Sequence, residues 1–352
     1  MKRLLIVVVM IVNTLNLNAQ DLKHLDEFLE VLENNDKLMA TMTITKDNVE
    51  IYNKALGNAD FESKIYNTSD TKFRIGSVTK SFTAVMIFQL IDEGKIKLNT
   101  PISLYFPEIN KASEITVGHL LNHSSGLFNI TNDKNFEDWM IKESSQKIML
   151  DRIKSYELDF NPGTTTAYSN TNYILLGYII EAIDKSLYAE SLKTRIIDRI
   201  NLKNTYVGNK IGLRSSESHS YINVEGQWRK QQETDMSNPG GAGAIVSSSS
   251  DLTQFMNALF SGKLISDKSL ELMKKTNDGE TCHGLFYAKT NGVDIYASEG
   301  GIDGFQSMLV HVPAYNITIA LTANGLDYSK VNIMLSAFKV LSGQPIEIPT
   351  FN

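Results

Sequence analysis

The first third of the chain places its hydrophobic residues at helix-like and strand-like intervals in turn. In residues 21–34 the leucines and a phenylalanine fall three and four positions apart, which predicts an amphipathic helix. Residues 39–57 then indicate two strands joined at Lys46-Asp47-Asn48, a hairpin. From Val78 to Glu93 the apolar residues return to helical spacing, and Gly94 is typical of a helix end.

The remainder of the pattern predicts the fold class. Helical spacing dominates residues 115–275, whereas residues 293–299, 305–312 and 317–323 are strand-like runs, and a last helix is predicted over 331–341. Strands at both ends of a chain with helices between them favour an α+β fold. We expect an antiparallel sheet built from both chain ends, flanked by the terminal helices, with a mostly helical lobe over residues 77–275. Residues 20–352 are predicted to form a single domain.

The chain opens with a pattern typical of a secretory signal peptide. Lys2 and Arg3 precede an unbroken apolar run from Leu4 to Val12, and the small residue Ala19 suits cleavage before Gln20. The run is shorter than the roughly 20 residues that span a bilayer, and the sequence near Ala19 has no cysteine for a lipid anchor. We therefore expect residues 1–19 to be a signal peptide and the mature protein to be periplasmic or secreted. No later segment predicts stable membrane insertion.

Net charge and cysteine content indicate which classes of binding partner and which stabilising bonds to expect. The 352 residues carry a formal net charge of −6, which gives no reason to expect nucleic acid or anionic lipid as a partner. Cys282 is the only cysteine, so no disulfide can form within the chain despite the expected oxidising compartment. Stability must then come from a large core, which this length allows.

The stretch RIGSVTKSFTA, residues 74–84, contains the first candidate for chemistry. A serine hydroxyl needs a nearby base to become a nucleophile, and Ser77 and Lys80 project from neighbouring positions at the start of a predicted helix. Unpaired N–H groups at a helix start favour an oxyanion beside Ser77, and Gly76 permits a close approach. The spacing alone is unspecific, and an N-cap serine with a solvated lysine explains it equally well. It recurs at Ser69/Lys72, Ser144/Lys147 and Ser336/Lys339.

A second segment, FNPGTTTAYSN at residues 160–170, supplies further candidates. The phenol of Tyr168 is able to accept the serine proton if a cation such as Lys80 lowers its pKa. Asn170 offers both a donor and an acceptor, and can hold Lys80 or a substrate amide. The Tyr-x-Asn pattern also occurs at Tyr221/Asn223, so by itself it decides nothing.

Five segments in a fixed order resemble one family. They are GSVTKSFTA, the Leu-Leu-x-His-x-Ser-Gly-Leu stretch at 120–127, FNPGTTTAYSN, GGAGAIVSSSSDL at 240–252 and GGIDGF at 300–305. Together they resemble the serine β-lactamase-related family of penicillin-recognising enzymes, which includes class C β-lactamases, D-alanyl-D-alanine carboxypeptidases and esterases. The resemblance covers about residues 25–341.

The resemblance implies the roles of the site residues. Ser77 would form an acyl-enzyme, Lys80 and Tyr168 would share the base work, and Asn170 would position Lys80 and the substrate. The backbone N–H groups of Ser77 and Gly301 would form the oxyanion hole, with Gly301 on an edge strand. It implies no cofactor and no metal.

The sequence departs from the family pattern at one motif. Where the family has Lys- or His-x-Gly, this chain has Ser298-Glu299-Gly300, so the cationic or imidazole side chain is missing. Strand alternation should point Glu299 away from Ser298. We expect an esterase or a peptidase/amidase-like hydrolase with weak or no β-lactam hydrolysis, because a substrate carboxylate would lack a partner. If another residue supplies the cation, Arg214 or Lys230 is the first candidate.

Other interpretations of the same residues are weaker. His119 and His123 have the spacing of a helical zinc pair but lack the adjacent glutamate and a third ligand. No Gly-x-Ser-x-Gly elbow occurs. Cys282 has no evident base and is interpreted as a packed residue. Arg74 and Lys72 are interpreted as paired or solvated charges.

The alternative function is a non-catalytic ligand-binding or sensor module of the same fold, supported by Ser298. The sequence predicts a small-molecule ester, peptide or peptidoglycan-derived substrate, and it indicates neither the particular substrate nor the oligomeric state.

Overall fold

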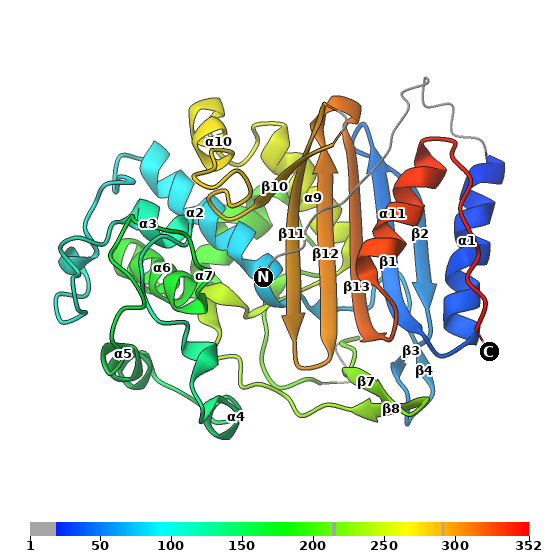
Figure 1. Ribbon diagram of the computed structural model, residues 1–352, viewed down its shortest axis with the longest axis horizontal. Coiled ribbons are helices and arrows are strands. Elements are labelled where there is room, and N and C mark those ends of the chain that lie inside the picture. Colours follow the sequence, from blue (N-terminus) through cyan, green and yellow to red (C-terminus); the bar gives the residue numbers. More distant parts are fainter. Residues whose placement is uncertain (1–18, 213–215, 291, 352) are drawn as a thin grey trace.

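The computed structural model describes residues 19–212, 216–290 and 292–351. An antiparallel sheet occupies one side of the molecule and a mostly helical lobe the other (Figure 1). The predicted α+β class and its sheet built from both chain ends are confirmed. Residues 1–18 lie outside the described residues, so the signal peptide stays a prediction. Within the described ranges no helix is both long and apolar enough to cross a membrane.

The sheet joins the two ends of the sequence in its centre. Strand β1 pairs with β13 on one side and with β2 on the other, and every neighbour along the main path is antiparallel. In sheet order the strands are β10 (Phe286–Thr290), β11 (Val293–Ile302), β12 (Phe305–Val312), β13 (Ile317–Leu326), β1 (Leu38–Lys46) and β2 (Val49–Leu56). A hairpin of β7 (Tyr221–Val224) and β8 (Gln227–Lys230) joins β13 through one parallel pair.

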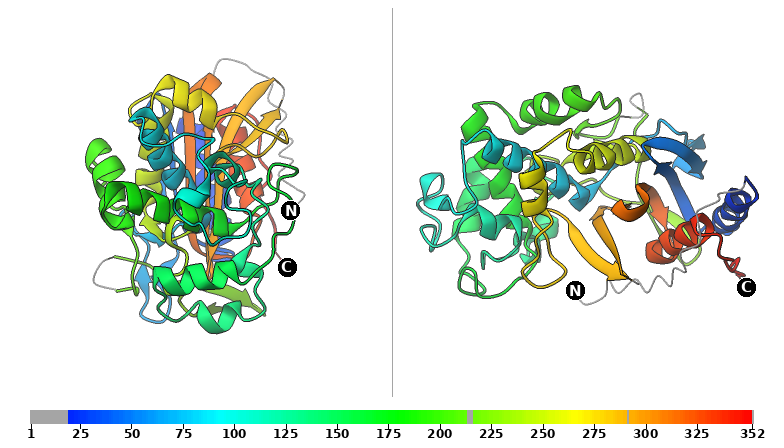
Figure 2. Two further views of the ribbon diagram at one scale, coloured as in Figure 1. Left: turned by 90° about the vertical axis from the view of Figure 1, so that its left-hand side faces the viewer. Right: turned by 90° about the horizontal axis from the view of Figure 1, so that it is seen from above.

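Both faces of the sheet are covered, which explains the nearly continuous burial of β1. The terminal helices α1 (Ala19–Asn34) and α11 (Lys330–Leu341) cover one face, where Met42 and Ile44 enter their core (Figure 2). Helix α9 (Ser249–Phe260) packs on the other face. There the β1 threonines find hydroxyl partners, with Thr43 Oγ1 lying 2.8 Å from Ser249 Oγ.

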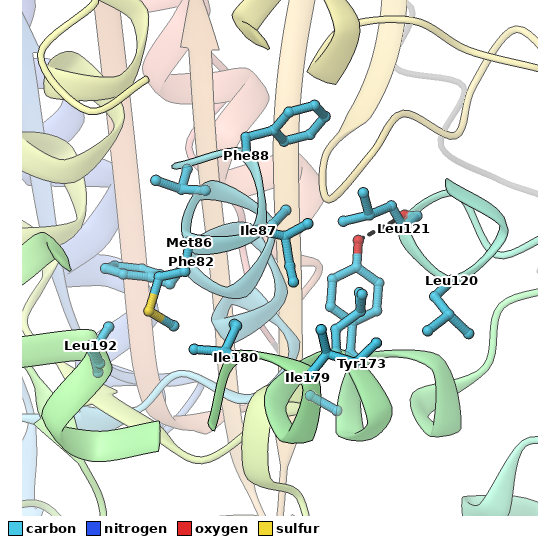
Figure 3. Close-up of a cluster of buried hydrophobic side chains, with 14 of the residues drawn as sticks. Phe82, Met86, Ile87, Phe88, Leu120, Leu121, Tyr173, Ile179, Ile180 and Leu192 are labelled. Atoms are coloured by element: carbon cyan, nitrogen blue, oxygen red, sulfur yellow. Dashed lines mark hydrogen bonds between the residues drawn. The ribbon is translucent and has the colours of Figure 1, made fainter. Parts of the chain in front are cut away.

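The helical lobe is held together by its own hydrophobic core, separate from the one under the terminal helices. Helix α2 (Thr79–Asp92) runs through its centre and is buried along nearly its whole length. It packs against α6 (Asn170–Asp184), where the buried Tyr173 donates to the carbonyl of Leu121 at 2.7 Å (Figure 3). The other α-helices here are α3 (Val117–Leu121), α4 (Phe136–Trp139), α5 (Gln146–Lys154), α7 (Tyr188–Leu192), α8 (Asp198–Ile200) and α10 (Asp267–Met273).

The structure corrects the predicted strands in three places. Gly300 and Gly301 lie within β11 and pair with Ser307 and Gln306, so the turn is only Asp303-Gly304. Strand β11 is not the sheet edge, because β10 pairs with its first half. Two short strands, β6 (Tyr206–Val207) and β9 (Ile245–Ser247), interrupt the region of predicted helical spacing. Three more, β3 (Asn58–Asp60), β4 (Ile65–Tyr66) and β5 (Phe73–Arg74), form between the hairpin and Ser77, where the sequence predicts no element.

Candidate active site

Ser77 lies where strand β5 turns into the helical lobe. Gly76 has a φ of +50°, which glycine adopts without strain, and a short 3₁₀ helix, η1 (Gly76–Val78), leads directly into α2. A Cβ at Gly76 would lie 2.8 Å from the backbone nitrogen of Gly301. The predicted close approach at Gly76 is therefore real, and its neighbour is strand β11.

The structure brings Ser77, Lys80, Tyr168 and Asn170 into one hydrogen-bonded cluster. Ser77 Oγ lies 2.6 Å from the Tyr168 hydroxyl and 2.9 Å from Lys80 Nζ. Lys80 Nζ also donates to Asn170 Oδ1 and to the carbonyl of Ala242, each at 2.8 Å. Ala242 ends the 3₁₀ helix η6 (Gly240–Ala242), so three distant segments of the chain hold the lysine.

The surroundings of Lys80 favour its neutral amine. Its side chain is buried, and burial holds its pKa well below the ordinary value because the charged form is desolvated. A neutral amine has two N–H donors and one lone pair. The oxygens of Asn170 and Ala242 only accept, so they take the two N–H groups, and the lone pair is left for the Ser77 hydroxyl. This is the arrangement that a base for Ser77 requires.

The condition under which Tyr168 would accept the serine proton, a pKa lowered by a cation, is not met. Burial raises the pKa of its phenol to about 12, opposed by the hydrogen bond with Ser77 and reinforced by the negative charge of Glu299. The expectation required a charged Lys80, and burial instead favours the neutral lysine. Either hydroxyl is able to donate across the 2.6 Å contact, and a raised phenol pKa favours Tyr168 as the donor to Ser77.

Asn170 is itself held in place by the segment before α4. Its backbone N–H and its Nδ2 donate to Asn129 Oδ1, and Nδ2 also donates to Thr131 Oγ1. Because Nδ2 is bound in this way, the side-chain oxygen of Asn170 is directed at Lys80. Asn129, Thr131 and Ala242 were not singled out from the sequence. The first two follow a recognised segment directly, and Ala242 lies within another, but a carbonyl carries no residue signature.

The second half of β11 forms the opposite wall of the site. Strand β10 pairs with residues 293–297 only, so residues 298–302 face η1 instead of another strand. A Cβ at Gly300 would lie 2.0 Å from the carbonyl oxygen of Ile75 and 3.0 Å from the backbone nitrogen of Ser77. Only glycine permits this contact between β11 and η1. Gly301, by contrast, has ordinary space around a Cβ, with no atom nearer than 3.6 Å.

Ser298 and Glu299 point to opposite faces of the sheet, as predicted. Ser298 is buried and lines a small cavity of about 20 Å³ together with Ser77, Lys80 and Tyr168. Glu299 forms an ion pair at 2.7 Å with Lys330, the first residue of α11 on the terminal-helix face. The place of the family's cation therefore holds a neutral hydroxyl beside the reacting groups.

A larger cavity of about 260 Å³ opens on the other side of Ser77. Its polar boundary includes Asn170, Gly301, Thr131, Thr234, Asn238 and Asp303. No Lys or Arg of the described ranges lines it. Its apolar lining comprises Ile130, Phe136, Trp139, Met140, Ile174, Pro239, Ala242 and Ile302. The ring of Trp139 is fixed by donation from Nε1 to Asp133 and by Arg152, whose guanidinium lies 4.0 Å from the ring centre. This cavity suits an apolar group adjacent to a carbonyl at Ser77.

The two histidines with zinc-like spacing lie in separate local structures. His119 completes a capping box with Thr116 at the start of α3. His123 is buried against the ring of Tyr168, and its Nδ1 lies 3.2 Å from the backbone nitrogen of Ser169 and 3.1 Å from Asn172 Nδ2. Burial lowers the pKa of His123 to about 3, because the charged imidazolium is desolvated. Among the residues that the structure describes, no group of three His, Cys, Asp or Glu side chains forms a metal site.

The other residues weighed from the sequence lie outside the hydrogen-bonded cluster at Ser77, although Cys282 lines the 20 Å³ cavity beside it. Cys282 is buried, burial raises the pKa of its thiol to about 12, and Sγ donates to the carbonyl of Lys274. Arg74 is buried in ion pairs, as predicted. Lys230 is exposed on β8 and lines neither cavity at Ser77. Arg214 lies outside the described residues.

A buried lysine hydrogen-bonded to a half-buried serine, which in turn contacts a half-buried tyrosine, lies between a helical lobe and an antiparallel sheet. This arrangement defines the class of β-lactamase-like serine hydrolases. The family model described as "Beta-lactamase" matches residues 28–339, so the chain belongs to the β-lactamase family. The predictions of this family and of a β-lactamase-related serine hydrolase are confirmed.

Three relatives show how the similarity is distributed. The chain is 26% identical over 317 residues to a teichoic acid D-alanine hydrolase of Staphylococcus aureus (strain MRSA252), covering 88% of this chain and 76% of that protein. It superposes on the D-amino acid amidase from Ochrobactrum anthropi SV3, complexed with L-phenylalanine amide, with a TM-score of 0.79 and 25% identity, covering 90% of this chain and 98% of that one. The chain also superposes on the octameric penicillin-binding protein homologue from Pyrococcus abyssi with a TM-score of 0.80 and 26% identity, covering 92% of this chain and 78% of that one.

Proposed function

We propose that the protein is an exported serine hydrolase that forms an acyl-enzyme at Ser77. Its substrates are esters or amides with an apolar acyl group and no carboxylate near the scissile bond. The observation that carries the proposal is the Ser77 hydroxyl held between the amine of Lys80 and the phenol of Tyr168. A module that only binds a ligand needs no buried amine within hydrogen-bonding distance of a serine hydroxyl.

The proposed reaction follows from the donors and acceptors of this cluster. Ser77 Oγ attacks the carbonyl carbon and its proton moves to the neutral amine of Lys80. The oxyanion is bound by the backbone N–H groups of Ser77 and Gly301. Tyr168 donates its proton to the leaving oxygen or nitrogen, and the Lys80 ammonium restores it because the buried phenolate is disfavoured. A water molecule then attacks the acyl-enzyme, with the same groups moving protons in reverse.

Two features support the substrate class. A carboxylate beside Ser77 would be desolvated without a cation, since Ser298 supplies a hydroxyl and the 260 Å³ cavity is lined by no Lys or Arg within the described part of the chain. The relatives named for teichoic acid D-alanine and D-amino acid amide hydrolysis act at carbonyls of D-amino acids. We therefore include D-aminoacyl esters and amides among the proposed substrates.

Export is proposed from the first residues of the sequence. Cleavage after Ala19 would leave the buried face of α1 intact, because its core residues Leu25, Phe28, Leu29 and Leu32 all follow that site. Expression of the full chain in a bacterium that exports proteins, followed by N-terminal sequencing of the extracytoplasmic product, tests this. A mature protein that begins at Gln20 supports it, and an uncleaved Met1 contradicts it.

The catalytic proposal is tested by labelling and by turnover. A fluorophosphonate should attach to Ser77, identified by mass spectrometry, and Ser77→Ala should abolish both labelling and hydrolysis. Ser124→Ala is the matched control, because Ser124 is a buried serine whose hydroxyl donates to Asn122. We expect hydrolysis of p-nitrophenyl butyrate and D-phenylalanine amide, and little of a chromogenic cephalosporin. Labelling that maps to Ser124, or persists in Ser77→Ala, would overturn the assignment.

A further inference from the structure

A buried ionic cluster joins the two backbone segments that face each other at Ser77. Arg74 ends strand β5 three positions before Ser77, and Asp303 lies in the turn two positions after Gly301. Their side chains are 2% and 1% exposed, and Arg74 NH1 lies 3.0 Å from Asp303 Oδ2. Neither residue lies among the proposed reacting groups.

The cluster is connected to a third segment through Thr234. Asp303 Oδ1 accepts from the backbone N–H and the hydroxyl of Thr234, at 3.0 and 2.7 Å. Arg74 NH1 also donates to the carbonyl of Thr234 at 2.8 Å, and NH2 donates to Asn209 and Glu233. Asp303 therefore accepts three hydrogen bonds, one from Arg74 on β5 and two from Thr234.

A second, uncharged bond joins the same two segments closer to the site. The buried Ser307 on β12 donates from Oγ to the carbonyl of Ile75 at 2.7 Å. Ile75 stands between Arg74 and Gly76, so both bonds attach the end of the β11–β12 hairpin to the residues that lead into Ser77.

The ion pair between Arg74 and Asp303 is expected to add little to the free energy of unfolding. Burying two charges costs roughly as much as their attraction returns, and apolar replacements are often equally stable. The pair instead fixes the position of two strands whose backbone N–H groups must converge on one oxygen atom. An error of about 1 Å in such an arrangement is enough to cost a hundredfold in rate.

We propose that Arg74 and Asp303 are positioning residues that set the separation between the backbone N–H groups of Ser77 and Gly301. The inference rests on the proposed acyl transfer at Ser77. Asp303 lines the 260 Å³ cavity, but both of its carboxylate oxygens are bound by Arg74 and Thr234, so we assign neither side chain a role at the reacting atoms. Their effect is transmitted through β5 and η1 on one side and through the β11–β12 turn on the other.

Asp303→Asn is the sharpest perturbation. Asp303 has a φ of +54°, which asparagine tolerates well, so the turn keeps its conformation. An amide has one acceptor oxygen, whereas Arg74 and the Thr234 N–H both donate toward the aspartate. In either orientation its NH₂ group meets a donor, and one connection is lost.

Glu233→Gln is the matched control. The side chain of Glu233 is 26% exposed and accepts from Arg74 NH2 and from the backbone N–H of Ile211 through the same oxygen. A glutamine oxygen is able to keep both bonds, while the change removes one negative charge from Arg74. It therefore alters the charge of the cluster without loosening the connection to the β11–β12 turn.

The experiment compares these variants as full chains after their folding has been verified by circular dichroism. For Asp303→Asn we expect kcat for p-nitrophenyl butyrate to fall about 30- to 100-fold with KM within about threefold. The Ki of phenylboronic acid, which forms a tetrahedral adduct with a serine, should weaken by a similar factor. Glu233→Gln should stay within about threefold in all three quantities, because its connections persist.

The outcomes separate the inference from the proposed function. Wild-type protein that no fluorophosphonate labels overturns the proposed function and with it the inference. Labelled wild-type protein together with a folded Asp303→Asn of unchanged kcat overturns the inference alone, as does an equal loss in Glu233→Gln. If Asp303→Asn does not fold, Arg74→Lys serves instead. One amine cannot replace both arms of the guanidinium, so kcat should fall about tenfold, and an unchanged kcat overturns the inference.

Discussion

Replacing each of two adjacent glycines in β11 by alanine should have very different effects on the rate of hydrolysis. In Gly300→Ala the new Cβ would meet the carbonyl oxygen of Ile75 at 2.0 Å, Ser307 Oγ at 2.5 Å and the Ser77 nitrogen at 3.0 Å. Carbon atoms do not approach such atoms closer than about 3 Å, so β11 and η1 must separate by about 1 Å. In Gly301→Ala the nearest atom lies at 3.6 Å, an ordinary contact.

The size of the effect follows from that displacement. Misplacement by about 1 Å costs on the order of a hundredfold in kcat, and overpacking lowers the free energy of unfolding by roughly 1–3 kcal/mol. We expect both losses in Gly300→Ala. Gly301→Ala should keep at least about a third of kcat, because alanine retains the backbone N–H that the oxyanion needs.

The assay is single-turnover acylation with p-nitrophenyl butyrate, run beside urea unfolding of each variant. A folded Gly300→Ala that acylates as fast as wild type would refute the reasoning, since the contact between β11 and η1 would then have no bearing on the rate. Equal losses in the two variants would also refute it, because the contacts of the two positions differ.

Lys80→Met and Tyr168→Phe should each slow single-turnover acylation by at least about a hundredfold, and the double variant should lose far less than the product. Multiplicative losses would contradict a shared proton path. Because burial holds the pKa of Lys80 below its ordinary range, kcat/KM should fall as the pH drops through that pKa. Above the pKa of Lys80, kcat/KM should stay level until Tyr168, with a pKa of about 12, ionises. A decrease in kcat/KM as the pH rises from 7 to 10 would count against Lys80 as the base. The free energy of unfolding should decrease as the pH falls from 6.5 to about 3, because only the unfolded chain protonates His123, whose folded pKa is about 3. The loss is of order 5 kcal/mol; urea melts of wild type and His123→Asn measure it, and equal slopes would contradict it. Ser298→Lys or Ser298→His should shift the ratio of kcat/KM values toward carboxylate-bearing substrates about ten- to a hundredfold, and efficient cephalosporin turnover by wild type would refute the premise.

The sequence predicts the parts of the fold that carry a long periodic signal. The hairpin of β1 and β2 alternates over many residues, and the helix that begins after Ser77 is apolar at helical spacing throughout. Strands such as β5 and β9 are too short to have a period, and they form only because each finds the other in the folded chain. The strand-like run predicted over residues 293–299 stops before the glycines, since glycine is unusual inside strands, whereas β11 continues to Ile302 and η1 requires glycine at position 300.

In the candidate site, too, the sequence predicts some features and misses others. Ser77, Lys80, Tyr168 and Asn170 were predicted because their side chains form recognisable motifs. The carbonyl of Ala242, which holds Lys80, belongs to the backbone and has no residue type of its own. The sequence could not decide whether the pKa of Tyr168 is lowered, because that pKa depends on burial, which no local pattern measures.

The central pairing of β1 with β13 has a consequence for the order in which the protein is made. Lys46 pairs with Ile317, so the ribosome must add about 270 residues between them, which takes roughly 15 to 55 s. For that interval one edge of β1 has no partner, and Ser77 is synthesised long before Gly301 can face it. Hydrolysis should therefore appear only in a chain that is complete through Leu326 and whose sheet has closed. An incomplete chain that lacks β11 to β13 should therefore be inactive.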